Sequence, residues 1–257
     1  VGGLSLHAYF FDTAVQKDDV RGAAAFLGDA AQPGDLIVIP DTDWSLEFEY
    51  AGETPIFMPD TDDPTGVFAG LAAQMTPGQR VFQLDYPRGT RDWQGVVAFA
   101  LEQAGALTAV TPFDGVEVRT YEINALPVFP AADDGVPAEF DGLALRGAWV
   151  EAGGAADTAV TIALHWQVAE TPPADLSVSL AVETVAGAPV SRADAPLRDD
   201  FGRPTSLWAP GQRVVTYHIV PLPPATTPTR HRALLTLYAL DADGAVQAQR
   251  PLAGEAA

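Results

Sequence analysis

Residues 203–217 read Arg203-Pro-Thr-Ser-Leu-Trp-Ala-Pro-Gly-Gln-Arg-Val-Val-Thr-Tyr217, and this stretch decides the fold of the second half of the chain. Pro204 and the Pro210-Gly211 pair are typical of turns. Trp208 lies between the two turns, where an indole can close the end of a β-sandwich. The side chains that follow alternate as in a strand, with Val214, Thr216 and His218 on one face and Val215, Tyr217 and Ile219 on the other.

The same alternation recurs through the rest of the second half. It predicts strands at 143–151, 158–168, 176–185, 214–220, 232–240 and 246–250. Trp166 is in phase with the apolar residues Val160, Ile162 and Leu164, which indicates a core position. Turn residues separate the strands, as in Asp241-Ala-Asp-Gly244 and Pro221-Leu-Pro-Pro224. We therefore predict an antiparallel β-sandwich over residues 138–257.

Helical and strand patterns alternate in the first half. Apolar positions at helical spacing predict helices from Val20, at 41–50, at 64–74 and at 92–104, with Asp18-Asp19 capping the first helix. Short apolar runs predict strands at 36–40, 55–58, 80–85, 107–111 and 116–123, the last two joined by a turn at Asp114-Gly115. This order predicts an α/β domain with a mainly parallel sheet over residues 1–123, and the proline-rich stretch 124–137 is predicted as a linker.

The α/β domain has a Rossmann-like pattern but no nucleotide-binding motif. After the first predicted strand the loop reads Pro40-Asp-Thr-Asp-Trp44, without the glycines of a dinucleotide fingerprint. Its two acidic residues would repel a pyrophosphate. Lys17 lies in no phosphate-binding loop. We therefore expect no cofactor.

The charge of the chain limits its partners. Among 257 residues there are 34 acidic and 14 basic ones, for a net charge of −20, and residues 1–123 alone carry 19 acidic and six basic residues. Such a field repels phosphate backbones, so we expect no nucleic-acid partner. The chain has no cysteine, which excludes thiolate catalysis and cysteine-ligated zinc. It contains no run of about 18 apolar residues.

Several segments resemble the soluble tail of bacterial membrane glycosyltransferases of the dolichyl-phosphate-mannose–protein mannosyltransferase and aminoarabinose-transferase type. In the second half they are Leu143-Ala-Leu-Arg-Gly147, Leu164-His-Trp-Gln167, Arg203-Pro-Thr-Ser-Leu-Trp-Ala-Pro-Gly211, Pro221-Leu-Pro-Pro224 and Leu235-Thr-Leu-Tyr-Ala-Leu-Asp241. In the first half they are Lys17-Asp-Asp-Val-Arg-Gly22 and Gln32-Pro-Gly-Asp-Leu-Ile-Val38, with Val20 where the family has an aromatic residue.

The resemblance implies a non-catalytic region, because the catalytic carboxylate of such enzymes is expected between early membrane helices. It implies a place on the extracytoplasmic face of the cell membrane and, as partners, the transmembrane part of the same polypeptide and a glycan or acceptor protein. The chain begins at Val1 without Met and without a signal-like segment, so we expect it to be part of a longer protein.

Two sets of residues are candidates for contacting a ligand. Asp41, Asp43 and Trp44 follow the first predicted strand, at the sheet edge where α/β proteins bind ligands, and carboxylates beside an indole suit sugar recognition. The alternative is a helix cap followed by a core tryptophan. Trp149 and Trp208 are the tryptophans best placed for exposure, and they can form a sugar-stacking surface or pack in the core.

Other clusters of polar residues favour structural roles. Asp60, Asp62 and Asp63 have oxygen ligands of the kind that Ca²⁺ prefers, but they lack a bidentate Glu at loop spacing, and we predict a solvated loop. His165, His218 and His231 lie on separate predicted strands without a second ligand at i+2 or i+4, so we expect no metal site. No Gly-x-Ser-x-Gly elbow marks a nucleophile.

Three hypotheses follow from the sequence. The first is an accessory tail of a membrane glycosyltransferase. The second is a secreted carbohydrate-binding protein without a membrane partner. The third is an independent α/β enzyme with an accessory sandwich, which requires perturbed carboxylates in a pocket near Asp41 or Asp85.

Overall fold

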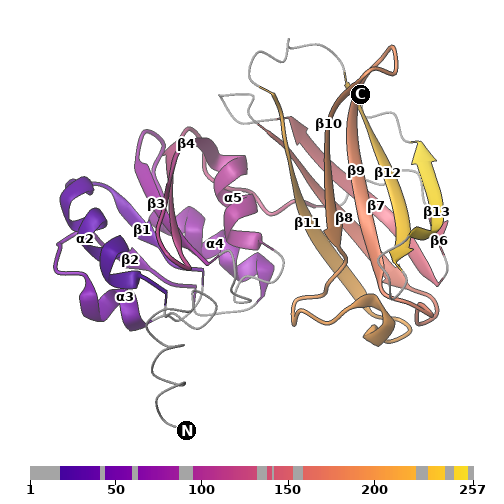
Figure 1. Ribbon diagram of the computed structural model, residues 1–257, viewed down its shortest axis with the longest axis horizontal. Helices are drawn as coiled ribbons and strands as arrows, with labels where there is room; N and C mark the ends of the chain where they lie inside the picture. Colours follow the sequence, from indigo (N-terminus) through magenta and orange to yellow (C-terminus); the bar gives the residue numbers. More distant parts are fainter. Residues whose placement is uncertain are drawn as a thin grey trace, which may run out of the picture.

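The computed structural model describes residues 18–40, 44–59, 63–86, 95–131, 138–140, 142–152, 159–223, 231–240 and 246–253. An α/β layer comes first along the chain and two antiparallel sheets follow (Figure 1). The fold class predicted from the sequence is thereby confirmed. Among the helices described, none has the length and apolar character needed to cross a bilayer.

The α/β layer is a five-stranded sheet with helices on both faces. Its elements are α2 (Val20–Ala30), β1 (Leu36–Val38), α3 (Trp44–Glu49), β2 (Ile56–Phe57), α4 (Pro64–Gln74), β3 (Arg80–Asp85), α5 (Val96–Ala104), β4 (Gly105–Pro112) and β5 (Glu117–Ile123). The strand order is β2-β1-β3-β5-β4. Strand β1 runs parallel to β2 and β3, whereas β5 runs antiparallel to β3 and β4. The sheet is thus mixed, because β4 and β5 form a hairpin.

The hairpin turn has a local cause. Gly115 has a φ of 77°, a left-handed conformation that favours glycine. A Cβ atom there would also lie 2.1 Å from Asp18 Oδ1. The backbone N–H of Asp19 donates to the carbonyl of Asp114, so this turn holds the start of α2 against the sheet.

The start of α2 follows the predicted aspartate cap, and α4 begins with a cap that the sequence-based prediction did not include. The Asp19 carboxylate accepts a hydrogen bond from the N–H of Gly22, and the Asp63 carboxylate accepts one from the N–H of Gly66. Each aspartate satisfies a backbone donor in the first turn of α2 or α4. One face of the sheet buries Phe82 and Leu84 with α2 and α3, and the opposite face buries Val81 with α4 and α5.

The two antiparallel sheets form the predicted sandwich. Its strands are β6 (Ala138–Phe140), β7 (Leu143–Ala152), β8 (Ala159–Val168), β9 (Leu176–Thr184), β10 (Pro189–Pro196), β11 (Arg213–Pro221), β12 (His231–Leu240) and β13 (Val246–Ala253), with a 3₁₀ turn η1 at Thr205–Leu207. One sheet has the order β10-β9-β12-β13 and the other β11-β8-β7-β6. Strands β6 and β10 are missing from the sequence-based prediction.

The alternation in β8 and β11 is confirmed, and both faces of these strands are used. Val160, Ile162, Leu164 and Trp166 belong to the sandwich core. Ala163, Val215, Tyr217 and Ile219, on the other face, contact the α/β layer. Helix α5 lies beside this outer face in Figure 1. The two parts of the chain therefore share a buried contact.

Five aromatic residues meet at that contact, and we call them the aromatic junction. They are Phe68 of α4, Phe99 of α5, Phe129, Trp149 of β7 and Tyr217 of β11. The ring of Phe99 lies 5.1 Å from Tyr217 and 5.8 Å from Trp149, between centroids. These distances suit edge-on and tilted ring packing. The junction joins the helices of the α/β layer to the sandwich.

Candidate functional site

The first predicted ligand group lies mostly outside the described residues. Asp41 and Asp43 are not among them, and Trp44 is described only as the first residue of α3. Of the predicted acidic loop, Asp63 is described, and its carboxylate caps α4. The interpretation of Asp41, Asp43 and Trp44 as ligand-binding residues stays a prediction.

The two predicted stacking tryptophans have different environments. Trp149 is half-buried, and its ring packs on Phe99 in the aromatic junction. Trp208 is 0% exposed, so its assignment as a candidate for exposure is wrong. Its ring packs in the sandwich core, and its Nε1 donates to the carbonyl of Arg203 at 2.9 Å. The indole thus closes the end of the sandwich with its one donor satisfied.

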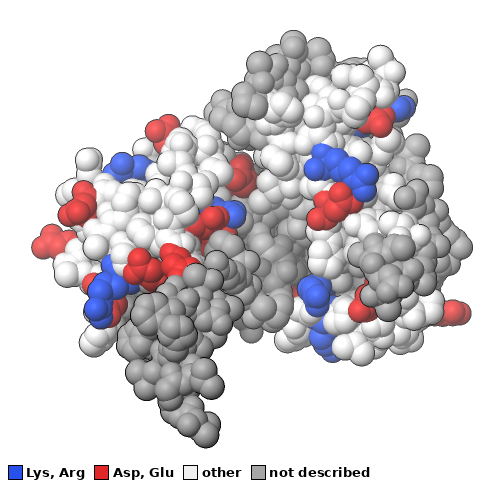
Figure 2. Space-filling view, viewed as in Figure 1, with Lys and Arg blue, Asp and Glu red and all other residues white. Residues whose placement is uncertain are grey.

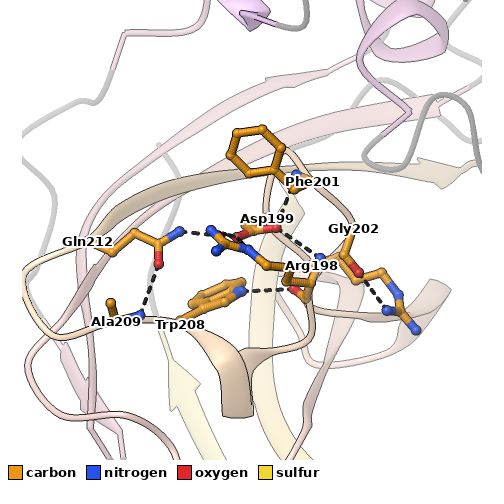
Figure 3. A network of polar contacts seen from close by, with 8 residues as sticks. Arg198, Asp199, Phe201, Gly202, Trp208, Ala209 and Gln212 are labelled. Atoms are coloured by element: carbon orange, nitrogen blue, oxygen red, sulfur yellow. Dashed lines mark hydrogen bonds and ion pairs between the residues drawn. The ribbon is translucent and has the colours of Figure 1, made fainter.

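A polar network surrounds Trp208 (Figure 3). Asp199, only 1% exposed, accepts hydrogen bonds from the backbone N–H groups of Phe201 and Arg203, from the Arg203 guanidinium and from the Gln212 amide. Burial raises the pKa of the Asp199 carboxyl, but these bonds outweigh it, and the pKa lies below its ordinary value. All of these contacts are internal, which is typical of a structural cap.

A second polar group lies between helix α5 and the sheet, and we call it the α5 cluster. It consists of Gln83 and Asp85 from β3, Glu102 from α5, and Glu117, Arg119 and Tyr121 from β5. In the antiparallel register Gln83 is opposite Arg119 and Asp85 is opposite Glu117. Alternate residues of a strand point to one face, so these side chains share the face that α5 covers.

Arg119 holds two carboxylates of the α5 cluster. Its Nη2 lies 3.0 Å from Asp85 Oδ2, and its Nε donates to Glu117 Oε1 at 2.7 Å. Burial lowers the pKa of Arg119, but the charge of Asp85 and the bond to Glu117 outweigh this effect and raise it. The guanidinium therefore stays charged and orients both acids.

Glu102 and Tyr121 form the inner part of the cluster. Glu102 is 8% exposed, and burial raises the pKa of its carboxyl, against the lowering effects of the Arg119 charge and of a hydrogen bond with Tyr121. Burial, and then the charge of Glu102, also raises the pKa of the Tyr121 hydroxyl. The third hypothesis requires perturbed carboxylates in a deep pocket near Asp41 or Asp85. The raised pKa of Glu102, which like Asp85 interacts with Arg119, meets the first of these two conditions.

Gln83 contributes an unusual feature. Its side chain is 0% exposed, and its Oε1 accepts a hydrogen bond from the Tyr121 hydroxyl at 3.3 Å. Its Nε2 is buried and finds no hydrogen-bond partner within the described part of the chain. The sequence contains a signal for this position, because Gln83 interrupts the apolar run Val81–Leu84 of a buried strand. The prediction from sequence did not use it.

The histidines do not meet. His165 is half-buried, with Nε2 3.0 Å from the carbonyl oxygen of Pro130, whereas His218 lies in β11 and His231 begins β12. Burial lowers the pKa of His218 to about 4. Within the described ranges no group of three His, Asp or Glu side chains is arranged to hold a metal ion.

Charge is distributed unevenly over the α/β part. Figure 2 shows carboxylates spread over its visible face, with fewer basic side chains between them. One exposed pair links α2 to α3, where Arg21 Nη2 lies 3.0 Å from Glu49 Oε1. The visible face of the α/β part thus agrees with the acidic balance of residues 1–123.

Comparisons with known proteins identify no family. No family model and no curated protein matches the chain. Among solved structures it is similar to the C-terminal domain of wzt, with 8% identity and a TM-score of 0.32 over 48% of this chain and 75% of that one. It is also similar to a β-glucuronidase from glycoside hydrolase family 2, with 12% identity and a TM-score of 0.27 over 54% of this chain and 13% of that one.

A third similarity extends further along the chain. An endonuclease/exonuclease/phosphatase from Beutenbergia cavernae is 12% identical, with a TM-score of 0.23 over 76% of this chain and 61% of that chain. Likenesses at these identities and scores assign neither a family nor an activity.

Proposed function

We propose that the chain is a non-catalytic accessory region of a membrane-embedded glycosyltransferase that uses a lipid-linked sugar. In this proposal the region lies on the extracytoplasmic face of the membrane, is continuous with the transmembrane part, and holds the glycan or acceptor for transfer.

The position of the resembling segments supports this proposal. Leu164-His-Trp-Gln167 lies in the central strand β8 and supplies the core residue Trp166, and Arg203–Gly211 forms the cap that buries Trp208. Their side chains are used for packing and for internal hydrogen bonds. Because the resembling segments build the framework of the sandwich, they agree with a supporting role better than with a catalytic one.

The aromatic junction adds a mechanical argument. Phe99 is 0% exposed and packs on two residues of the sandwich, Trp149 and Tyr217. Burying an aromatic side chain of this size contributes about 1.5–3 kcal/mol. A sandwich fixed to the α/β layer in this way suits a region that must hold an acceptor at a constant place.

The test compares the complete transferase with this chain alone, using polyprenyl-phosphate mannose as donor. We expect no transfer by the isolated chain. We expect transfer by the complete protein, and reduced transfer to acceptor when the junction is opened by Phe99→Ala, with donor cleavage retained. Turnover of the donor by the isolated chain, or a complete gene product without membrane helices, would contradict the proposal. Tight binding of oligosaccharides by a secreted form would favour the second hypothesis.

A further inference from the structure

The end of the sandwich beside Trp208 carries two exposed apolar side chains. They belong to residues 198–213, which lead from β10 into β11 and which we call the sandwich cap. Phe201 is 68% exposed and Leu207 is 60% exposed. Single exposed apolar residues are common on protein surfaces. A phenylalanine and a leucine that are both exposed within one short turn segment indicate a contact surface.

The sandwich cap holds these side chains in fixed positions. One carboxylate oxygen of Asp199 accepts hydrogen bonds from the backbone N–H groups of Phe201 and Arg203, at 3.0 and 2.9 Å. The N–H of Leu207 donates to the carbonyl of Pro204. In Figure 3 the ring of Phe201 points away from the polar network. A loop that is already ordered loses little conformational entropy when it docks onto another surface.

Arginine side chains accompany the apolar ones. The sandwich cap has three arginines and two aspartates, a formal net charge of +1 in a chain whose net charge is −20. They are Arg198, Asp199, Asp200, Arg203 and Arg213. The side chain of Arg203 is 45% exposed, and its guanidinium carbon lies 5.2 Å from the centroid of the Phe201 ring. Arg213 is exposed and forms no ion pair within the described part of the chain. Figure 2 shows basic side chains at this lower end of the sandwich.

These properties select a phospholipid surface as the partner. Guanidinium groups pair with phosphate oxygens, and they do so in the lipid headgroup layer. Phenylalanine and leucine gain free energy by entering the boundary between the headgroups and the acyl chains. A small soluble anion would use the arginines and leave the apolar side chains in water. The acidic α/β part opposes the contact only over the Debye length, which is about 8 Å at physiological salt.

We propose that the sandwich cap contacts the surface of a bilayer that contains anionic phospholipids. Phe201 and Leu207 enter the headgroup region, and Arg203 and Arg213 pair with lipid phosphates. The inference rests on the proposed function, which brings the chain beside a membrane, and it deepens that function by naming the end of the sandwich that faces the bilayer.

The first experiment uses the absence of cysteine from the chain, which allows one fluorescent label at a chosen position. Leu207→Cys and Val185→Cys are each labelled with the polarity-sensitive dye NBD. Val185 is the matched control, because it is 68% exposed and follows the far end of β9, whereas the start of β9 contacts the sandwich cap. The probe is a vesicle of equal parts phosphatidylglycerol and phosphatidylcholine.

We expect the emission of the label at position 207 to move to shorter wavelength when vesicles are added, and to be quenched by lipids that carry a doxyl group. The emission of the label at position 185 should not change. No response at position 207, or an equal response at both positions, would overturn the assignment.

The second experiment measures how the unlabelled chain sediments with the same vesicles. Phe201→Ser should lower the partition coefficient by about tenfold, and Arg213→Gln by about fivefold. Val185→Ser should partition like the unchanged protein, and vesicles of phosphatidylcholine alone should bind the chain more weakly. Thermal unfolding of each variant establishes that it is folded. Equal partitioning of Phe201→Ser, or equal binding to the neutral vesicles, would contradict the proposed contact.

This inference and the proposed function can fail separately. If the sandwich cap does not contact vesicles while Phe99→Ala still impairs the complete transferase, the membrane contact is wrong and the accessory role stands. If the cap contacts vesicles and the complete gene product has no membrane helices, the accessory role is wrong and the chain is a peripheral membrane protein.

Discussion

The indole Nε1 of Trp166 donates a hydrogen bond of 2.9 Å to the Oγ1 atom of Thr216, inside the sandwich between strands β8 and β11. Trp166 is 1% exposed and Thr216 is 3% exposed. The same hydroxyl lies 2.9 Å from Nε2 of His218. The Thr216 hydroxyl therefore satisfies two buried polar groups. We expect it to contribute more to stability than a hydroxyl with a single hydrogen bond.

Replacement of this hydroxyl tests the relationship. Thr216→Val keeps the shape of the side chain but leaves the Trp166 N–H and the His218 ring without their partner. We expect the free energy of unfolding to fall by about 2–3 kcal/mol, measured by urea denaturation. Thr216→Ser retains the hydroxyl and should lose much less. Little loss for Thr216→Val, or a larger loss for Thr216→Ser, would show that the hydrogen bonds of this hydroxyl contribute little to stability.

His218 predicts a pH dependence of stability. Burial lowers its pKa to about 4 in the folded protein, whereas an unfolded histidine titrates near 6.5. Between these values the unfolded state binds the proton and the folded state does not, so the free energy of unfolding decreases as pH falls from about 6.5 to about 4. The full effect is about 3 kcal/mol. His218→Gln removes this titration, so its unfolding free energy should depend less on pH in that window. Parallel curves for both proteins would refute the assignment.

The contacts of Asp199 predict that Asp199→Asn lowers the free energy of unfolding. Asp199→Asn keeps the size of the side chain but removes the charge that Arg203 faces, and it places an NH₂ group among donors. Asp199 is buried but the Arg203 side chain is 45% exposed, so we expect a loss of about 1–3 kcal/mol, as for a buried acceptor whose hydrogen bonds are disrupted. Thermal unfolding should show the loss, and Trp208 fluorescence should shift as the cap loosens. Asp194→Asn, in the exposed pair with Arg192, is the control and should change stability little.

The bounds of helices and strands are predicted best where a local pattern, such as a helix cap or an apolar run, determines them. The bounds of α4 and β3 agree with their predictions, because Asp63 and Pro64 begin the helix and a short apolar run makes the strand. Strand β10 was missed because its sequence is polar and has a proline at each end, as edge strands often do. Its pairing with β9 comes from tertiary contact and not from its own pattern.

The α5 cluster could not be predicted from spacing alone. Gln83, Glu102 and Tyr121 come from three elements, and only Gln83 stands out in its own segment, as a polar residue in an apolar strand. They meet because the pairing of β5 with β3 places Tyr121 beside Val81, and α5 packs against β4 and β5. The burial of Trp208 was equally hidden, since the same turn-Trp-turn pattern permits an exposed or a buried ring.

The aromatic junction predicts that packing, and not polar contact, joins the two parts of the chain. Phe99→Ala removes a fully buried ring and should lower the free energy of unfolding by about 3–5 kcal/mol. Tyr217→Phe removes only a hydroxyl that has no partner among the described residues, and it should leave stability unchanged or raise it by about 1 kcal/mol. Calorimetry should resolve two transitions for Phe99→Ala and one for Tyr217→Phe. A destabilised Tyr217→Phe would reveal a polar bond at the junction.

Glu102 predicts a pH dependence of the opposite sign to His218. Its pKa is raised by burial, so in the window between the unfolded and folded pKa values the folded state holds the proton and the unfolded state does not. The free energy of unfolding therefore decreases as pH rises through that window.

Glu102→Gln keeps an acceptor for Tyr121 and removes the penalty of the buried charge. At pH 7 the variant should be more stable than the unchanged protein, by about 1 kcal/mol, and at pH 4 the difference should disappear. Urea denaturation at both pH values measures this. Glu122→Gln, at an exposed position of β5, should show no such difference. A gain for Glu102→Gln that is the same at both pH values would mean that the carboxyl is not held in its protonated form by the fold.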